Sequence, residues 1–395
     1  MAEAKPTAVA YKQVGDLTLY VDVYPPTPES DVPAPAVVFF HGGGMTSGDR
    51  TSWFPTWLLS ESFPPSLASA CARLLGLTSS HRNSGRTTAA GLAFLSADYR
   101  LLAPSTGHDI LDDVVDLFAF LARTQLLGAV QIDNTRLAVA GASAGGMCAF
   151  LAAVHAKPKP CAVLSIYGLG GNIFVRSSSL HTIHTTETNT PTKQSPHLLS
   201  PKTKPFFMGQ ELLDPTQLSE FMFPASSSLA PVAQSPPSYF GPGSATPGAP
   251  SNPRMLLARL WLQFGAYLDY WTGLHDPSIS DKLRELLPAE GEDIAAANAR
   301  LAAALPASEH AIFPQLLVTS DWPRVLFVHG SKDSAVLPQS SRALHARLLD
   351  ANVQTALRIV EGSEHAFDLR RGAEDAFGAL FDEAAEFLRA ALLDA

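Results

Sequence analysis

Short, mostly apolar runs recur along the chain. The first, residues 34–40, ends before His41-Gly42-Gly43-Gly44, and the second, residues 92–97, ends before Asp98. Four further runs cover residues 137–140, 161–166, 324–328 and 356–360. Strands without a polar face are typical of a parallel sheet that is covered on both sides. These runs therefore predict the strands of one buried sheet.

Helical patterns lie between these runs. Residues 109–124 place their apolar side chains on one stripe, and residues 143–155, 340–351 and 374–393 are also predicted to be helical. Before the first run, residues 8–23 alternate in polarity around Gly15-Asp16, which predicts an opening hairpin. Alternating strands and helices build right-handed βαβ units. The predicted fold class is α/β, with a mostly parallel, doubly covered sheet.

Two segments interrupt this alternation. Residues 51–90 separate two strands by far more than an ordinary loop. Residues 168–322, called the cap segment below, lie between the fourth and fifth sheet runs. Many of the 31 prolines fall in its part 176–253, which is also rich in Ser and Thr and is expected to be ordered coil or partly disordered. Its part 254–305 is predicted to be helical, with helices at 281–287 and 291–305. We expect residues 1–167 and 323–395 to form one domain and the cap segment to be inserted into it; an unrelated second domain is the alternative.

The composition argues against several classes of protein. The formal net charge is −9 and only 16% of residues are charged, with no basic cluster that would bind nucleic acid. No apolar run approaches the roughly 18 residues of a membrane helix, and the amino terminus has no apolar core of the kind that secretory signals need. The three cysteines, Cys71, Cys148 and Cys161, are too few for a disulfide framework. We therefore expect a cytoplasmic protein without a transmembrane segment and without a nucleic-acid partner.

The most specific motif is Gly141-Ala142-Ser143-Ala144-Gly145. It directly follows one predicted strand and precedes a predicted helix, which is the context of a nucleophile elbow. Flanking glycines allow the sharp turn that holds a serine hydroxyl clear of its own backbone. A tight turn of the dinucleotide-binding type is the alternative, but the sequence does not match G-x-G-x-x-G. Ser143 is the predicted nucleophile.

A serine nucleophile needs a base, and the base needs a carboxylate that fixes its tautomer. His365 follows the last predicted strand and is the predicted base. Asp333 follows the strand 324–328 and gives the chain order Ser143, Asp333, His365. Glu361, Glu364 and Asp368 are rival acids, but they lie very close to His365 in sequence.

Acyl transfer also needs hydrogen-bond donors for the oxyanion. The glycine run after the strand 34–40 lets backbone N–H groups approach a substrate closely. We predict an oxyanion hole formed by the amides of Gly42, Gly43 and Gly44 together with Ala144.

Together these motifs resemble the α/β-hydrolase superfamily, and most closely its HGGG-motif esterases related to hormone-sensitive lipase. The resemblance rests on His41–Gly44, Asp98-Tyr99-Arg100-Leu101-Leu102-Ala103-Pro104, Asp112-Asp113 and Gly141–Gly145, and it covers residues 8–167 and 323–395. Three features depart from that group. Ala142 replaces a common Asp, and the stretch 328–338 is more similar to dienelactone hydrolases and prolyl oligopeptidases. The cap of that group is mostly amino-terminal, whereas the largest insertion of this chain lies between the strand before Ser143 and the strand before Asp333.

The resemblance implies hydrolysis of a carboxylic ester or lactone of a largely apolar small molecule, through an acyl-serine intermediate and without a metal or organic cofactor. Ser143 would be the nucleophile, His365 the base and then the acid, and Asp333 the residue that orients it. Acyl transfer to another acceptor and thioester cleavage use the same groups, and a hydrolase fold without activity that binds a ligand is a further alternative.

The substrate pocket has weaker indicators. We expect Met45, Phe206, Phe207, Trp261 and Phe264 to line it, although aromatic clusters of this kind are often simply the core of a cap. His181 and His184 have a spacing that some metal ligands share, but no third ligand is evident, so a metal site is not expected. Cys148 is expected to be buried packing.

Overall fold

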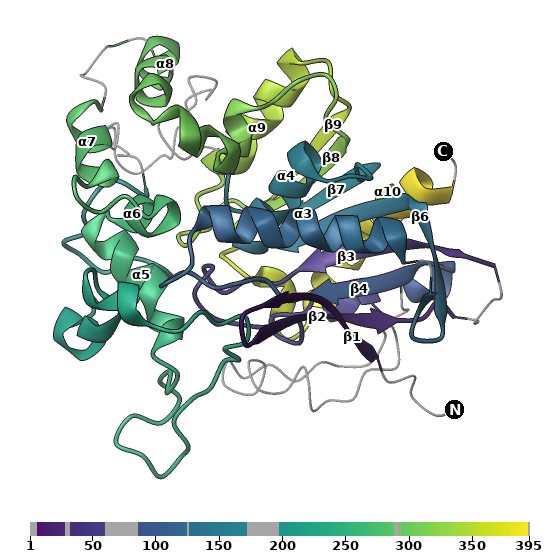
Figure 1. Cartoon of the computed structure of the whole chain (residues 1–395), viewed down its shortest axis with the longest axis horizontal. Helices are drawn as coiled ribbons and strands as arrows, with labels where there is room; N and C mark the ends of the chain where they lie inside the picture. Colours follow the sequence, from purple (N-terminus) through teal and green to yellow (C-terminus); the bar gives the residue numbers. More distant parts are fainter. Residues whose placement is uncertain are drawn as a thin grey trace.

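The computed structural model describes residues 6–27, 32–59, 86–124, 126–171, 197–287, 292 and 294–393. Its centre is a nine-stranded sheet with the order β1-β2-β4-β3-β6-β7-β8-β9, in which β5 pairs with β6 (Figure 1). The strands are β1 (Thr7–Val14), β2 (Leu17–Tyr24), β3 (Ala34–Phe40), β4 (Ala93–Ala97), β5 (Leu126–Leu127), β6 (Val130–Ala142), β7 (Ala162–Ile166), β8 (Arg324–Gly330) and β9 (Thr355–Val360).

The strands from β4 to β9 along this order are parallel, while β1, β2 and β4 pair antiparallel. Every residue of β3, β4 and β7 is buried, as expected for strands that are covered on both faces. Since parallel strands end at the same edge, the loops after β3, β6, β7, β8 and β9 converge there.

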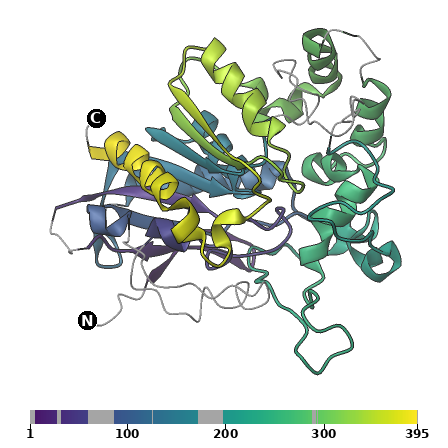
Figure 2. The same cartoon turned by 180° about the vertical axis from the view of Figure 1, so that it is seen from behind.

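Helices cover both faces of the sheet. One face packs against α3 (Gly107–Arg123), α4 (Gly145–His155) and α9 (Gln339–Asp350). The other face packs against α1 (Thr56–Leu59) and α10 (Ala373–Leu393). Figure 2, which shows the molecule from behind, has the yellow α10 running across the sheet. The amphipathic stripe of α3 buries Ile110, Val114 and Leu121.

The cap segment lies beyond the carboxyl ends of the parallel strands, coloured teal to green (Figure 1). Its helices are η2 (Pro215–Phe221), η3 (Ala225–Ser228), α5 (Arg254–Phe264), α6 (Tyr267–Thr272), α7 (Ile279–Glu285), α8 (Ile294–Ala304), η4 (Ala307–Ile312) and η5 (Pro314–Leu316). The fully buried Trp261 and Trp271 anchor it. Trp271 packs directly on Gly107, where an added Cβ would lie 2.6 Å from the indole ring.

The predicted α/β class and the opening hairpin are confirmed, and the six predicted runs are all strands. Two boundaries differ. β6 begins at Val130 rather than at residue 137, because Val130 and Gln131 pair with β5 and Ile132 pairs with Ala34. The helix predicted from residue 143 begins at Gly145, since Ser143 adopts a left-handed conformation that no α-helix contains.

Two expectations concern segments that the structure describes only in part. The insertion 51–90 contains α1 and η1 (Thr88–Ala90), and residues 60–85 lie outside the described part. His181 and His184 also lie outside it. Among the described residues, no helix combines the length and apolar character that crossing a membrane requires.

Candidate active site

Ser143 stands at the sharp turn between β6 and α4. Its φ of +53° lies in the left-handed region, and its amide donates to Ile166 O at 2.9 Å. The turn depends on its glycines, because a Cβ on Gly141 would lie 2.1 Å from Gly145 O and a Cβ on Gly145 would lie 2.1 Å from Phe40 O. The turn thus presents the Ser143 side chain, which is partly exposed, among buried neighbours.

The loops after β8 and β9 bring Asp333 and His365 to this serine. His365 Nε2 lies 2.9 Å from Ser143 Oγ, and His365 Nδ1 lies 2.7 Å from Asp333 Oδ2. With Nδ1 donating to the carboxylate, Nε2 is free to accept the serine hydroxyl proton. Ser143 and His365 are 222 residues apart in sequence, and Asp333 and His365 are 32 apart, yet the three side chains form one continuous chain of hydrogen bonds.

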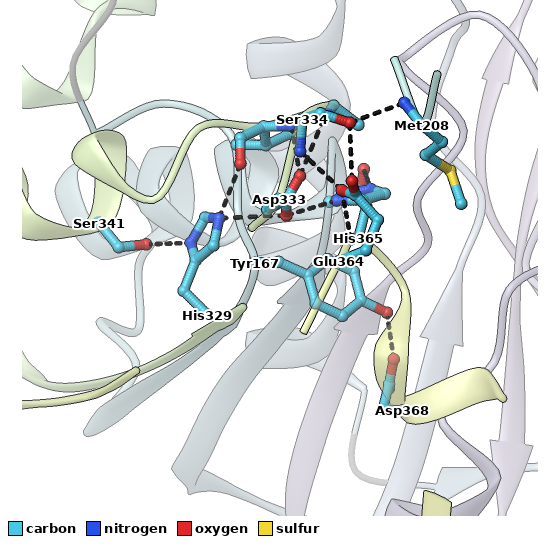
Figure 3. Close-up of polar contacts among 12 residues, drawn as sticks. Tyr167, Met208, His329, Asp333, Ser334, Ser341, Glu364, His365 and Asp368 are labelled. Atoms are coloured by element: carbon cyan, nitrogen blue, oxygen red, sulfur yellow. Dashed lines mark hydrogen bonds and ion pairs between the residues drawn. The ribbon is translucent and has the colours of Figure 1, made fainter. Parts of the chain in front are cut away.

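Asp333 is buried, and four groups surround its carboxylate (Figure 3). Oδ1 accepts from the amides of Ala335 and Val336, at 3.0 and 2.9 Å. Oδ2 faces His365 and also His329, whose Nε2 lies 3.2 Å away. Burial alone would raise the pKa of Asp333, but the two histidines and their hydrogen bonds hold that pKa well below its ordinary value. The carboxylate is therefore charged at neutral pH.

His329 is a fully buried partner of Asp333 that the sequence analysis missed. Its Nδ1 lies 2.8 Å from Ser341 Oγ, and its Nε2 lies 2.8 Å from Val336 O (Figure 3). A ring nitrogen that faces a carbonyl and a carboxylate must carry a proton, so Nε2 is a donor. His329 therefore adds a donor to the Asp333 carboxylate.

The rival acids do not reach the imidazole of His365. Glu364 turns away and accepts from the amide and hydroxyl of Ser334, at 2.6 and 2.9 Å, and from the amide of His365 (Figure 3). Glu361 is exposed. Asp333 is the carboxylate that accepts a hydrogen bond from that ring within the described part of the chain.

The third rival acid, Asp368, belongs to a separate hydrogen-bond network next to His365. It accepts from Tyr167 Oη at 2.7 Å and from Trp57 Nε1 at 2.9 Å. The Tyr167 ring meets the His365 ring edge to face, with centroids 4.7 Å apart. Burial raises the pKa of Asp368 above its ordinary value, although both hydrogen bonds lower it. This network supports one side of the imidazole.

The glycine loop after β3 borders Ser143. A Cβ on Gly42 would lie 3.3 Å from Ser143 Cβ and 3.9 Å from its Oγ. Gly43 and Gly44 have φ of +98° and +67°, and a Cβ on Gly43 would lie 2.2 Å from Ser47 O. Among the described residues, the amides of Gly43 and Ala144 donate no hydrogen bond to the protein. These N–H groups can therefore serve a ligand.

Beside this loop, His41 is fully buried and stacks on Tyr99 with ring centroids 4.4 Å apart. Its Nδ1 lies 2.8 Å from Gly42 O. Burial lowers the pKa of His41 to about 4, so this imidazole is neutral at neutral pH. It acts as a rigid support of the glycine loop.

Comparison with known proteins agrees with the observed fold. A family model of the α/β-hydrolase fold matches residues 73–240. Solved structures with the same architecture include an α/β-hydrolase superfamily protein from Enterococcus faecalis, at a TM-score of 0.52 and 17% identity over 94% of this chain and 95% of that one. The chain has the α/β-hydrolase fold.

Further proteins similar to this chain carry more specific descriptions. A probable carboxylesterase, M8, of Phoma sp. is 27% identical over 169 residues, which are 40% of this chain and 45% of that protein, so the match spans less than half of it. A thermophilic esterase of Thermogutta terrifontis, Est2, has a TM-score of 0.50 at 15% identity over 97% of this chain and 91% of its own. A Staphylococcus aureus protein of unknown function has a TM-score of 0.54 at 15% identity, with 98% and 99% covered.

The residues predicted to line a substrate pocket occupy different environments. Met45 is buried beside the glycine loop, and Trp261 is buried in the cap segment, stacked on Tyr270 at 3.8 Å. Phe206 and Phe207 are partly exposed and contact each other, while Phe264 is 38% exposed. The segment of Phe206 and Phe207 is tied to the site, because the Met208 amide donates to Ser334 Oγ at 2.7 Å (Figure 3).

Proposed function

We propose that this chain is a serine hydrolase that cleaves carboxylic esters or lactones through an acyl-serine intermediate. The observation that carries the proposal is the unbroken chain of hydrogen bonds from Ser143 Oγ through His365 to Asp333, at 2.9 and 2.7 Å. Such an arrangement activates a hydroxyl that is otherwise a poor nucleophile. In this proposal Ser143 is the nucleophile, His365 the base and Asp333 the residue that orients it.

In the first half of the reaction, Ser143 Oγ attacks the ester carbonyl carbon while His365 Nε2 takes the hydroxyl proton. The carbonyl oxygen becomes an oxyanion, which the amides of Gly42, Gly43 and Ala144 stabilise. Collapse of this intermediate breaks the bond to the alkoxide, which leaves with the proton from His365. Water then repeats the sequence on the acyl-serine and releases the acid. Asp333 stays charged throughout, in agreement with its lowered pKa.

Descriptions of related proteins favour ester chemistry over other acyl transfers. M8 is described as a probable carboxylesterase, and Est2 of Thermogutta terrifontis is described as an esterase, with one structure bound to butyrate. The fold alone hosts many reactions. The assignment to this chain therefore rests on its own serine, histidine and aspartate.

We propose an uncharged, largely apolar substrate. Phe206 and Phe207 lie on a segment that is hydrogen-bonded to Ser334, the neighbour of Asp333, and Met45 follows the glycine loop. Aromatic and thioether side chains of this kind suit an acyl or alcohol group without charge. The predicted roles of Trp261 and Phe264 in substrate binding remain predictions.

The test is a panel of p-nitrophenyl esters of increasing chain length, together with small lactones. We expect the wild type to hydrolyse members of the panel and Ser143→Ala to have no activity above background. Ser165→Ala is the matched control, because Ser165 is a buried serine on β7 whose hydroxyl has no partner within the described part of the chain. Equal hydrolysis by wild type and Ser143→Ala would refute the proposal. Appearance of an ester product only when an alcohol is added would instead identify an acyltransferase.

A further inference from the structure

The loop 41–47, called the oxyanion loop below, is held from two sides. From the core, the Leu102 amide donates to Met45 O at 2.7 Å. From the cap segment, Tyr267 Oη donates to Gly44 O at 3.0 Å and Arg254 Nε donates to Thr46 O at 2.9 Å. The cap segment thus satisfies two carbonyls of the loop that carries the proposed oxyanion donors.

The conformation of this loop needs such support. Gly43, Gly44 and Met45 are consecutive residues with positive φ, at +98°, +67° and +63°. Such a conformation is strained for Met45, which has a Cβ, and it persists only where the surroundings fix it. Helix α5 packs directly on the loop, because a Cβ on Gly44 would lie 2.4 Å from Ala258 Cβ. The cap segment therefore forms one wall of the loop.

Arg254 makes several of the hydrogen bonds that hold the oxyanion loop. Its buried guanidinium donates to Thr46 O, to Leu102 O at 2.6 Å and to Ala103 O at 3.0 Å. The Thr46 hydroxyl returns a hydrogen bond to Arg254 O at 2.8 Å. Within the described part of the chain no carboxylate pairs with Arg254, and burial lowers its pKa to about 10. This buried cation is compensated by main-chain carbonyls and by the Phe221 ring, whose centroid lies 5.7 Å from Arg254 Cζ, and it ties together the two loops whose carbonyls it contacts.

We propose that Tyr267 and Arg254 are positioning residues for the oxyanion hole, so that the cap segment is a structural part of the catalytic machinery. This inference rests on the proposed function. An oxyanion donor is effective only when its N–H points to the place where the charge develops, and loss of one donor costs about 10²–10³ in rate. A loop that loses its hydrogen bonds to the cap segment would aim the Gly43 amide less accurately.

The test compares Tyr267→Phe with Tyr270→Phe. Both variants remove one hydroxyl from α6, but the Tyr270 hydroxyl contacts the Phe223 amide and Met222 Sδ, which both belong to the cap segment. For Tyr267→Phe we expect kcat to fall about tenfold at nearly unchanged KM, as for one lost buried hydrogen bond. Affinity for a trifluoromethyl ketone, which forms a tetrahedral anion on serine, should fall by the same factor. Hydrogen exchange in a peptide spanning 41–47 should be faster.

Tyr270→Phe should keep the wild-type values in all three measurements. Arg254→Lys is a second variant. Because one ammonium cannot reach three carbonyls, kcat should fall in this variant too while KM stays nearly unchanged. Unchanged kcat, inhibitor affinity and exchange in Tyr267→Phe would overturn the role of the cap segment while an active wild type upholds the proposed function. A wild type that neither hydrolyses esters nor binds the inhibitor would overturn the proposed function and the oxyanion role together, even if exchange in 41–47 responds to Tyr267→Phe.

Discussion

Asp333→Asn should reduce kcat about 10⁴-fold without unfolding the protein. In the wild type, Asp333 Oδ1 accepts from two amides, those of Ala335 and Val336. Oδ2 accepts from His365 Nδ1 and from His329 Nε2, and the latter nitrogen also has Val336 O as an acceptor. An asparagine has one oxygen and one NH₂ group to place in these two positions. If its NH₂ group faced the two amides, both buried N–H groups would lose their acceptor, at a cost of about 1–3 kcal/mol each.

The asparagine oxygen will therefore stay on the amides of Ala335 and Val336, and its NH₂ group will face His365 Nδ1. That nitrogen must then accept a hydrogen bond, so the proton of the neutral ring moves to Nε2. His365 Nε2 would donate to Ser143 instead of accepting from it. A loss of 10⁴ corresponds to about 5.4 kcal/mol of transition-state stabilisation.

The assay is ester hydrolysis at neutral pH with thermal denaturation as a check of folding, and Glu364→Gln is the matched control. The glutamine side chain of this control keeps an oxygen for the amides of Ser334 and His365, and its NH₂ group can donate to Ser334 Oγ, so kcat should stay within about tenfold of the wild type. A folded Asp333→Asn variant with more than a tenth of wild-type kcat, or an equal loss in Glu364→Gln, would refute this reasoning.

Three further results are expected. His41 has a pKa of about 4 in the folded chain and an ordinary value near 6.5 when unfolded, so the unfolded state binds the proton first as the pH falls. The free energy of unfolding, measured with urea, should therefore drop by about 2 kcal/mol from this group between pH 7.5 and pH 5, and His41→Asn should remove that share. Asp368→Asn should lower the free energy of unfolding by about 1–3 kcal/mol, because one of the two donors on Asp368 would lose its acceptor, while kcat changes less than tenfold. Ser143→Ala should unfold at the wild-type temperature to within about 2 °C, since it deletes one partly exposed hydroxyl; a large loss of stability would mean that Ser143 is mainly structural.

The parts that the sequence predicts well depend on local pattern. The buried strands are continuous apolar runs. The turn at Ser143 needs glycine on both sides because a Cβ there would clash within the turn or with the neighbouring strand β3. Asp333 and His365 are predictable because parallel strands end at one edge, where loops that are distant in the chain meet.

The missed residues depend on contacts that no local pattern reveals. The partners Thr46 and Arg254 are 208 residues apart, and Arg254 opens an apolar helix in which it has no special spacing. His329 lies just past the apolar run 324–328, and nothing in that run indicates that its ring faces Asp333. Asp368 is close to His365 in sequence, but its side chain accepts a hydrogen bond from Trp57, which is 311 residues away.

The most direct test of the proposed catalytic role is covalent labelling of the folded wild-type chain with a fluorophosphonate, read by intact mass and then by peptide mapping. The phosphorus of the reagent bonds to the activated serine oxygen and releases fluoride, so labelling reports on nucleophilicity rather than on binding. We predict one adduct, located on Ser143, that is absent in Ser143→Ala and strongly slowed in Asp333→Asn. A folded wild type that gains no adduct, or gains it on another serine, would contradict the account.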